Sequence, residues 1–149
     1  MLTTIEKVIF LQDVDIFKFT STQDLAHVAA ITEEVAFTKE EPIYKEGDLS
    51  DSMYLIIEGS VALRRDGNNL LIAGPKDVFG TWALFDDEPR VVTALPLEET
   101  RLLRINKDDF FELLADHSEI TQGILKTIVK RLRGLIDRIQ IGGKSGMDE

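Results

Sequence analysis

The chain has 149 residues, 27 acidic and 17 basic, which gives a formal net charge of −10 with both histidines neutral. The length fits one domain, and 44% hydrophobic with 30% charged residues is typical of a soluble globular protein rather than a disordered acidic chain. The net negative charge disfavours nucleic acid and anionic lipid as main partners. The absence of cysteine excludes disulfides and thiolate chemistry, and it agrees with a cytoplasmic location.

Two helices are predicted at the start of the chain, within residues 3–31. Residues 1–10 lack the long apolar run of a signal peptide or a membrane span, so direct membrane insertion is not expected. Apolar residues at near-helical spacing predict the first helix from Thr3, and Ser21 is the expected N-cap of the second. These apolar residues are Ile5, Val8, Ile9 and Leu11, then Leu25, Val28 and Ala29.

The pattern from residue 34 to residue 105 is that of a sheet. Apolar and polar residues alternate there, and Gly47, Gly59 and Gly67 each follow an acidic residue, as in the tight turns of an all-β barrel or sandwich. No segment between the strands has a helical pattern long enough for a parallel crossover, so neighbouring strands should be antiparallel. Strands are expected near residues 35–37, 53–57, 61–63, 70–73, 91–95 and 101–105.

Two closing helices are predicted within residues 107–141. Asn106 is the expected N-cap of the first, with acidic residues in its first turn. The second has a long apolar stripe, which we expect to pack partly on the barrel and partly on a second copy, giving a homodimer. The stripe consists of Ile120, Ile124, Ile128, Leu132, Leu135 and Ile139, and the other faces are rich in lysine and arginine. Residues 142–149 are expected to form a flexible tail.

The segment from Val78 to Ala94 interrupts the strands and has the features of an anion site. Gly80 allows a backbone bend, and the free N–H groups of a helical turn over Thr81 to Phe85 can bind an anion. Arg90, which follows a proline, can add a bidentate guanidinium to the same anion. The alternative for Arg90 is a surface arginine paired with the acidic residues at 86–88.

These residues carry a resemblance to a known family. The barrel after two helices, the Phe79-Gly80-x-x-Ala83-Leu84 segment, and Pro89-Arg90 with Thr93 three residues later resemble the cyclic-nucleotide-binding domain and its phosphate-binding cassette. The similarity extends over roughly Leu11 to Ile139. It implies a mainly β fold with flanking helices: an antiparallel double-stranded β-helix, or jelly-roll-like barrel, with N-terminal helices and two C-terminal helices, all within residues 1–141.

The resemblance also implies a ligand and a set of contacts. In the family, the arginine at position 90 pairs with the cyclic phosphate, backbone N–H groups near Ala83 and Leu84 complete the phosphate site, and the closing helix covers the purine. Alignment through Phe110 places this cover near Leu135 and Ile136. The ligand-binding residues implied are Phe79, Gly80, Thr81, Ala83, Leu84, Pro89, Arg90, Val91, Leu135 and Ile136, with cyclic AMP or cyclic GMP as ligand and no cofactor.

The chain departs from the family at Thr81. The family usually has glutamate there, which accepts a hydrogen bond from the ribose 2′-OH; losing a bond to a charged group weakens binding by roughly 10- to 100-fold. Threonine is shorter and neutral but still an acceptor. Val91 likewise lacks the hydroxyl that some members have.

Other chemistry-bearing residues are expected to be structural. Trp82 is expected to pack the cassette turn on the barrel, and His27 and His117, which lie far apart in the sequence, to be ordinary helix or cap residues. Neither a catalytic group nor a metal site is expected, because no nucleophile or metal-ligand constellation stands out.

Two functions therefore stay open. The first is a non-catalytic regulatory module that binds a cyclic nucleotide and couples it to helix rearrangement in a partner chain or an attached effector domain. The second is a degenerate module without nucleotide binding that serves dimerisation or assembly. Relatives that regulate transcription have a helix-turn-helix domain after the last helix; because this sequence ends at Glu149, nucleic acid is not an expected partner.

Overall fold

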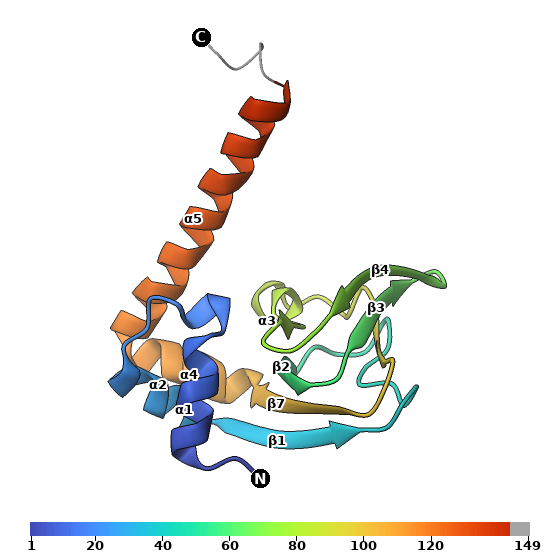
Figure 1. Cartoon of the computed structure of the whole chain (residues 1–149), viewed down its shortest axis with the longest axis horizontal. Coiled ribbons are helices and arrows are strands. Elements are labelled where there is room, and N and C mark those ends of the chain that lie inside the picture. Colours follow the sequence, from blue (N-terminus) through green and yellow to red (C-terminus); the bar gives the residue numbers. More distant parts are fainter. Residues whose placement is uncertain (144–149) are drawn as a thin grey trace.

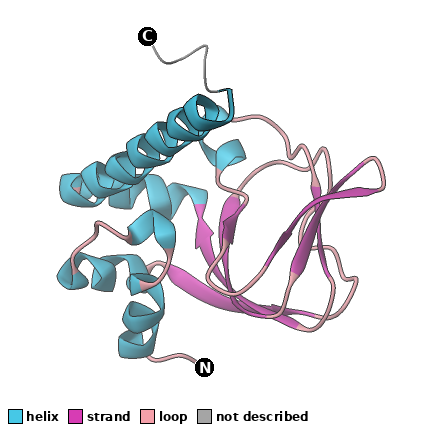
Figure 2. Ribbon diagram, turned by 45° about the horizontal axis from the view of Figure 1, so that its top comes forward, coloured by secondary structure: helices cyan, strands magenta, loops and turns pink. Residues whose placement is uncertain are grey.

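The computed structural model describes residues 1–143, with side chains described up to residue 139. Its strands form two antiparallel sheets. One has the order β1-β7-β2-β5 and the other β4-β3-β6, and the two face each other on one side of the molecule (Figures 1 and 2). The strands are β1 (Thr32–Phe37), β2 (Ser52–Glu58), β3 (Val61–Arg65), β4 (Asn68–Ala73), β5 (Val78–Phe79), β6 (Thr93–Pro96) and β7 (Thr100–Asn106). The predicted fold, mainly β in a jelly-roll-like arrangement with flanking helices, is confirmed.

Most helices gather at the other side of the molecule (Figure 2). They are α1 (Thr4–Gln12), the short 3-10 helix η1 (Asp15–Phe17), α2 (Thr22–Ala30), α4 (Lys107–Asp116) and α5 (Ser118–Gly143). The five-residue helix α3 (Trp82–Asp86) lies instead among the strands (Figure 1). Helix α5 packs mainly against η1 and α4 and then projects beyond the rest of the molecule.

The helix ends follow from the predicted caps. The Ser21 hydroxyl accepts from the Asp24 N–H at 3.1 Å, and the Asn106 side chain accepts from the Asp108 N–H at 2.8 Å. Both bonds satisfy donors that a helix start leaves free. The predicted turn at Asp66-Gly67 is also present, with φ of 54° and 80°, the two positive values that a tight hairpin turn requires.

Strand β2 contributes to two hydrophobic clusters because successive side chains point to opposite faces of a sheet. Met53 and Leu55 belong to the cluster that includes the helices, while Tyr54 and Ile56 belong to the cluster between the sheets. The barrel and the helical part therefore share strand β2.

The structure differs from the sequence expectations at several boundaries. The sixth strand starts at Thr93 rather than at residue 91, so Arg90 lies in the loop before it. Strand β5 was not predicted, because two residues are too short for any periodic pattern. Of the expected tail, Gly142 and Gly143 belong to α5, and residues 144–149 lie outside the described residues. Among residues 1–143, the structure holds no helix that is both long and apolar enough to cross a membrane.

Candidate functional site

Arg90 points into the protein and is only 4% exposed. Its guanidinium donates to two backbone carbonyls, Nη1 to Gly80 at 2.8 Å and Nη2 to Ser52 at 2.5 Å. Its Nε is buried and has no hydrogen-bond partner among the described residues. The alternative of a surface arginine paired with the acids at 86–88 is therefore wrong. The side chain is a buried cation held by neutral acceptors, and Nε is its one nitrogen without a hydrogen bond among the described residues.

Gly80 makes room for this guanidinium. Its φ is +83°, and a Cβ at this position would lie 2.8 Å from Arg90 Nη1 and 3.3 Å from the Ser52 carbonyl oxygen. Such a contact is too short for any side chain to be tolerated without movement of the arginine. The predicted role of Gly80 in a bend is confirmed, and the structure adds that this bend encloses the arginine.

Tyr44, one of a group of three aromatic rings, contacts the guanidinium of Arg90. Its guanidinium carbon lies 3.9 Å from the centroid of the Tyr44 ring, and Tyr44, Tyr54 and Phe79 lie close to one another, the last two stacked at 5.4 Å. A cation over an aromatic face is stabilised by the ring quadrupole. Burial raises the pKa of Tyr44 to about 12, and the nearby Arg90 opposes part of this rise. The tyrosines are therefore neutral near neutral pH and do not compensate the arginine charge.

Helix α3 is anchored by Leu84, not by Trp82. Leu84 is fully buried, whereas Trp82 is 85% exposed. The expectation that Trp82 packs the turn on the barrel is wrong, because the first residue of this short helix points to solvent while the core position falls two residues later. The Leu84 N–H donates to the Thr81 carbonyl at 3.1 Å, so this donor is already used within the turn.

The acidic residues 86–88, at and after the end of α3, are exposed. Asp86 accepts from the Glu88 N–H at 3.0 Å, and Asp87 pairs with Lys107 at 2.5 Å. These contacts turn their carboxylates toward the surface and the start of α4, so they are largely screened from Arg90 by solvent.

Leu135 and Ile136, expected to cover a purine, are 46% and 54% exposed on the projecting part of α5. Pro89 and Val91, which flank Arg90, are also exposed, and Ala83 and Thr81 are half-buried at the start of α3. The structure thus gathers Phe79, Gly80 and Arg90 with α3, while the two α5 residues lie outside this group. Their contact with a ligand stays a prediction.

Sequence reasoning missed Ser52, Tyr44 and Tyr54 as neighbours of Arg90. They come from β2 and from the segment before it, 36 to 46 residues earlier in the chain. The polar-apolar alternation in β2 places Ser52 and Tyr54 on one face, but only the sheet pairing of Tyr54 with Phe79 shows that this face meets the cassette. Two shallow surface hollows lie away from Arg90. One is lined by residues that include Phe37 and Arg101, and the other by residues that include His27 and His117.

Comparison with known proteins places the chain in a family. Residues 34–117 match the family model of the cyclic nucleotide-binding domain. The "CRP-like cAMP-activated global transcriptional regulator" of Mycobacterium tuberculosis is 35% identical over 114 residues, which cover 71% of this chain and 51% of that protein. The cAMP-dependent protein kinase regulatory subunit of Debaryomyces hansenii is 31% identical over 112 residues, covering 74% of this chain and 25% of that protein.

A solved structure supports the same assignment. The N-terminal domain of a transcriptional regulator from Streptomyces coelicolor A3(2) superposes with a TM-score of 0.77 at 31% identity, covering 86% of this chain and 95% of that one. The fold is that of a jelly-roll-like β domain with flanking helices. The chain belongs to the cyclic nucleotide-binding domain family.

The chain spans about half or less of the length of the curated relatives named above. These relatives are regulatory proteins, and one is named as a transcriptional regulator. The expectation that nucleic acid is not a partner therefore stays a prediction.

Proposed function

We propose that this chain is a regulatory module that binds cyclic AMP, or a related cyclic nucleotide, at the cassette and carries out no reaction. The observation that carries the proposal is the buried guanidinium of Arg90, whose Nε has no partner among the described residues. The bend at Gly80 leaves space for this guanidinium. The family and the cAMP-related names of two relatives agree with it.

The electrostatics of Arg90 favour an anionic ligand. A buried charge is costly unless it is paired, and the carbonyls of Gly80 and Ser52 are neutral. A phosphate oxygen at Nε would supply both the missing acceptor and the missing negative charge, in the charge-assisted geometry that arginine prefers.

The packing of α3 offers a path from the cassette to the closing helices. Phe85 of α3 meets Phe110 and Phe111 of α4 edge to face, with ring centroids 6.0 and 5.5 Å apart. Because α4 leads directly into α5, a ligand that shifts α3 would bias the position of α5, and Leu135 and Ile136 would then reach the base. An attached or partner effector domain would read this change.

The test is calorimetric titration of the chain with cyclic AMP and with cyclic GMP, beside two variants. Thr81→Glu restores the acceptor for the ribose 2′-OH, so it should tighten binding by about 10- to 100-fold. Arg90→Lys keeps a positive charge but removes Nε and the planar fork, so it should weaken binding by at least about tenfold.

Arg65→Lys serves as the matched control, since this arginine is exposed at the end of β3 and should leave the affinity unchanged. The proposal is supported by saturable binding that is tightest for Thr81→Glu, weaker for the unaltered chain and weakest for Arg90→Lys. Thr81→Glu also keeps the test valid if Arg90→Lys fails to fold.

The alternative function is a module without nucleotide binding that serves dimerisation or assembly. It is favoured by Thr81 in place of the usual glutamate and by the exposed apolar row along α5, which includes Leu132 and Leu135. Absence of heat with either nucleotide at millimolar concentration, for both the unaltered chain and Thr81→Glu, would leave only this alternative.

A further inference from the structure

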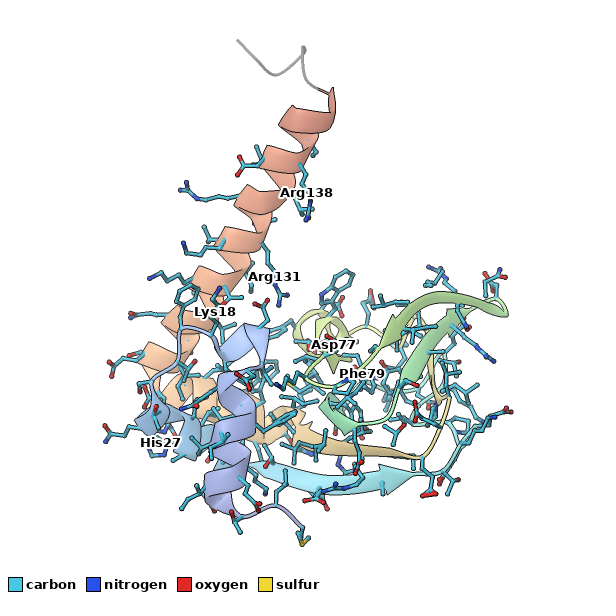
Figure 3. All side chains as sticks on the ribbon, viewed as in Figure 1. Lys18, His27, Asp77, Phe79, Arg131 and Arg138 are labelled. Atoms are coloured by element: carbon cyan, nitrogen blue, oxygen red, sulfur yellow. The ribbon has the colours of Figure 1, made fainter. Side chains whose placement is uncertain are left out.

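The chain has only two histidines, and the fold brings them together away from the cassette. His27 lies on α2 and His117 at the joint between α4 and α5, and their ring centroids are 4.2 Å apart with an interplanar angle of 25°. Figure 3 labels His27 at the helical side of the molecule, away from the labelled Phe79. Two imidazoles in contact place nitrogen donors near each other, and histidine is the most common metal ligand in proteins.

Asp24 adds a third donor to this pair. It lies on α2 one helical turn before His27, and the ligand atoms of Asp24, His27 and His117 all lie within 4.8 Å of one another. A spacing of three residues puts two side chains on the same face of a helix. The three donors therefore come from two separate segments, held together by the packing of α2 against the α4–α5 joint.

The surroundings are hollowed and negatively charged. Both histidines line a shallow hollow of about 220 Å³, together with the acidic residues Asp109, Glu112 and Asp116 of α4. Asp24 and His117 are half-buried and His27 is exposed, so a hydrated ion can reach the donors from solvent. Negative charge around the hollow raises the local concentration of cations.

We propose that Asp24, His27 and His117 bind a divalent transition-metal ion such as Zn²⁺. Two imidazoles and one carboxylate suit zinc and its neighbours, whereas calcium and magnesium take oxygen ligands. Ligand atoms around one such ion lie closer together than 4.8 Å, so side-chain rotation must draw them inward and unstack the two rings. Water completes the coordination.

The site has a structural consequence because its donors lie on separate elements. A bound ion would tie α2 to the α4–α5 joint, and the unfolded chain does not hold the three donors together. Metal should therefore stabilise the folded state and raise the melting temperature.

Titration of the full, tag-free chain with Zn²⁺ tests the proposal, followed by calorimetry and by proton NMR. The two histidines give two resolvable Hε1 signals, and both should change together as one equivalent is added. His27→Gln, His117→Gln and Asp24→Asn should each weaken binding by about tenfold or more. Glu119→Gln, an exposed acid near His117 but outside the donor set, is the control and should leave the affinity unchanged.

The melting temperature with and without Zn²⁺ separates a built site from scattered surface binding. A rise for the unaltered chain that is lost in His27→Gln supports the proposal. Zn²⁺ affinity that is the same in His27→Gln as in the unaltered chain, or a titration in which neither histidine signal changes, overturns it. Because His27 is exposed on α2, we expect His27→Gln to fold, so it tests the zinc site even if His117→Gln does not fold.

Discussion

Arg90 illustrates how the surrounding fold can hold a buried charged side chain in one position. Its charge is buried, two of its nitrogens are fixed by the carbonyls of Gly80 and Ser52, and a third faces no partner among the described residues. The guanidinium is thus held in one position, and the proposed ligand would not need to order a flexible side chain on binding. The sequence predicts main-chain donors in this turn, yet the main-chain groups that contact the guanidinium are the acceptor carbonyls of Gly80 and Ser52. This difference explains how the side chain stays in place on its own.

Glu34 provides a prediction at the residue scale. Its carboxylate accepts from the Leu2 N–H and from Arg101 Nη2, both at 2.8 Å, and these bonds lower its pKa from the ordinary value of 4.5, the backbone bond most strongly. A lowered folded-state pKa stabilises the protein above the ordinary carboxyl pKa, and the stabilisation is lost as the pH falls through the lowered value. We expect Glu34→Gln to reduce the free energy of unfolding by about 1 kcal/mol at pH 7.

Urea unfolding at about pH 7 and about pH 3 checks this prediction, since the gap between Glu34→Gln and the unaltered chain should narrow in acid. Glu33→Gln is the control, because its carboxylate is 63% exposed and pairs only with Arg104 at the surface. It should change the free energy by less than about 0.5 kcal/mol. An equal gap at both pH values would refute the assigned role of Glu34.

At the scale of elements, periodic patterns predicted most of the fold. Helices with capping residues and strands with alternating side chains were placed correctly, because a cap and a buried face are local properties of the sequence. The two-residue β5 and the neighbours of Arg90 could not be placed, because they depend on pairing between distant segments. The cassette glycine and arginine were found from local motif, whereas Ser52 and the tyrosines required the fold.

Helix α5 also shows what the apolar pattern of a sequence cannot predict. The sequence predicted a continuous apolar stripe that packs partly on the barrel. In the structure Ile120 and Ile124 are buried in the cluster shared with the N-terminal helices, while Ile128 and Leu132 are 43% and 55% exposed. Periodicity identifies which residues share a face, but not where along the helix the covering partner ends.

Gly123 of α5 gives a prediction at this scale. A Cβ there would lie 2.9 Å from the Phe19 carbonyl oxygen, a backbone atom that cannot move without shifting the loop before α2. We expect Gly123→Ala to lower the free energy of unfolding by about 1–3 kcal/mol, even though alanine favours helix.

Gly134 of the same helix is the matched control, because a Cβ there meets nothing within 4 Å. Gly134→Ala should be neutral or stabilising by up to about 1 kcal/mol. Thermal unfolding of the two variants in parallel measures the difference. If Gly123→Ala were as stable as Gly134→Ala, α5 would not be docked closely on the turn at Phe19.

For the whole molecule, the exposed row on α5 predicts association. The row comprises Leu125, Ile128, Val129, Leu132, Leu135, Ile136 and Ile139, each at least 43% exposed. Its spacing of three and four residues is that of a two-helix seam, so a second copy of α5 is the occupant we expect. Sedimentation should find a dimer for the unaltered chain and a monomer for Leu132→Glu.

Arg133→Glu is the control for this prediction, since it changes charge at the neighbouring exposed position outside the row. It should remain a dimer. A monomeric unaltered chain at high concentration would disprove pairing through α5, without bearing on the cassette.

The central claim is that the free Nε of Arg90 receives a cyclic phosphate. Proton–nitrogen NMR of the arginine Nε–H groups observes this donor directly, with the Arg90 signal assigned by its loss in Arg90→Lys. Saturation with cyclic AMP should move this proton signal strongly downfield, as a new charge-assisted hydrogen bond requires. A signal that stays in place at millimolar cyclic AMP would contradict the account.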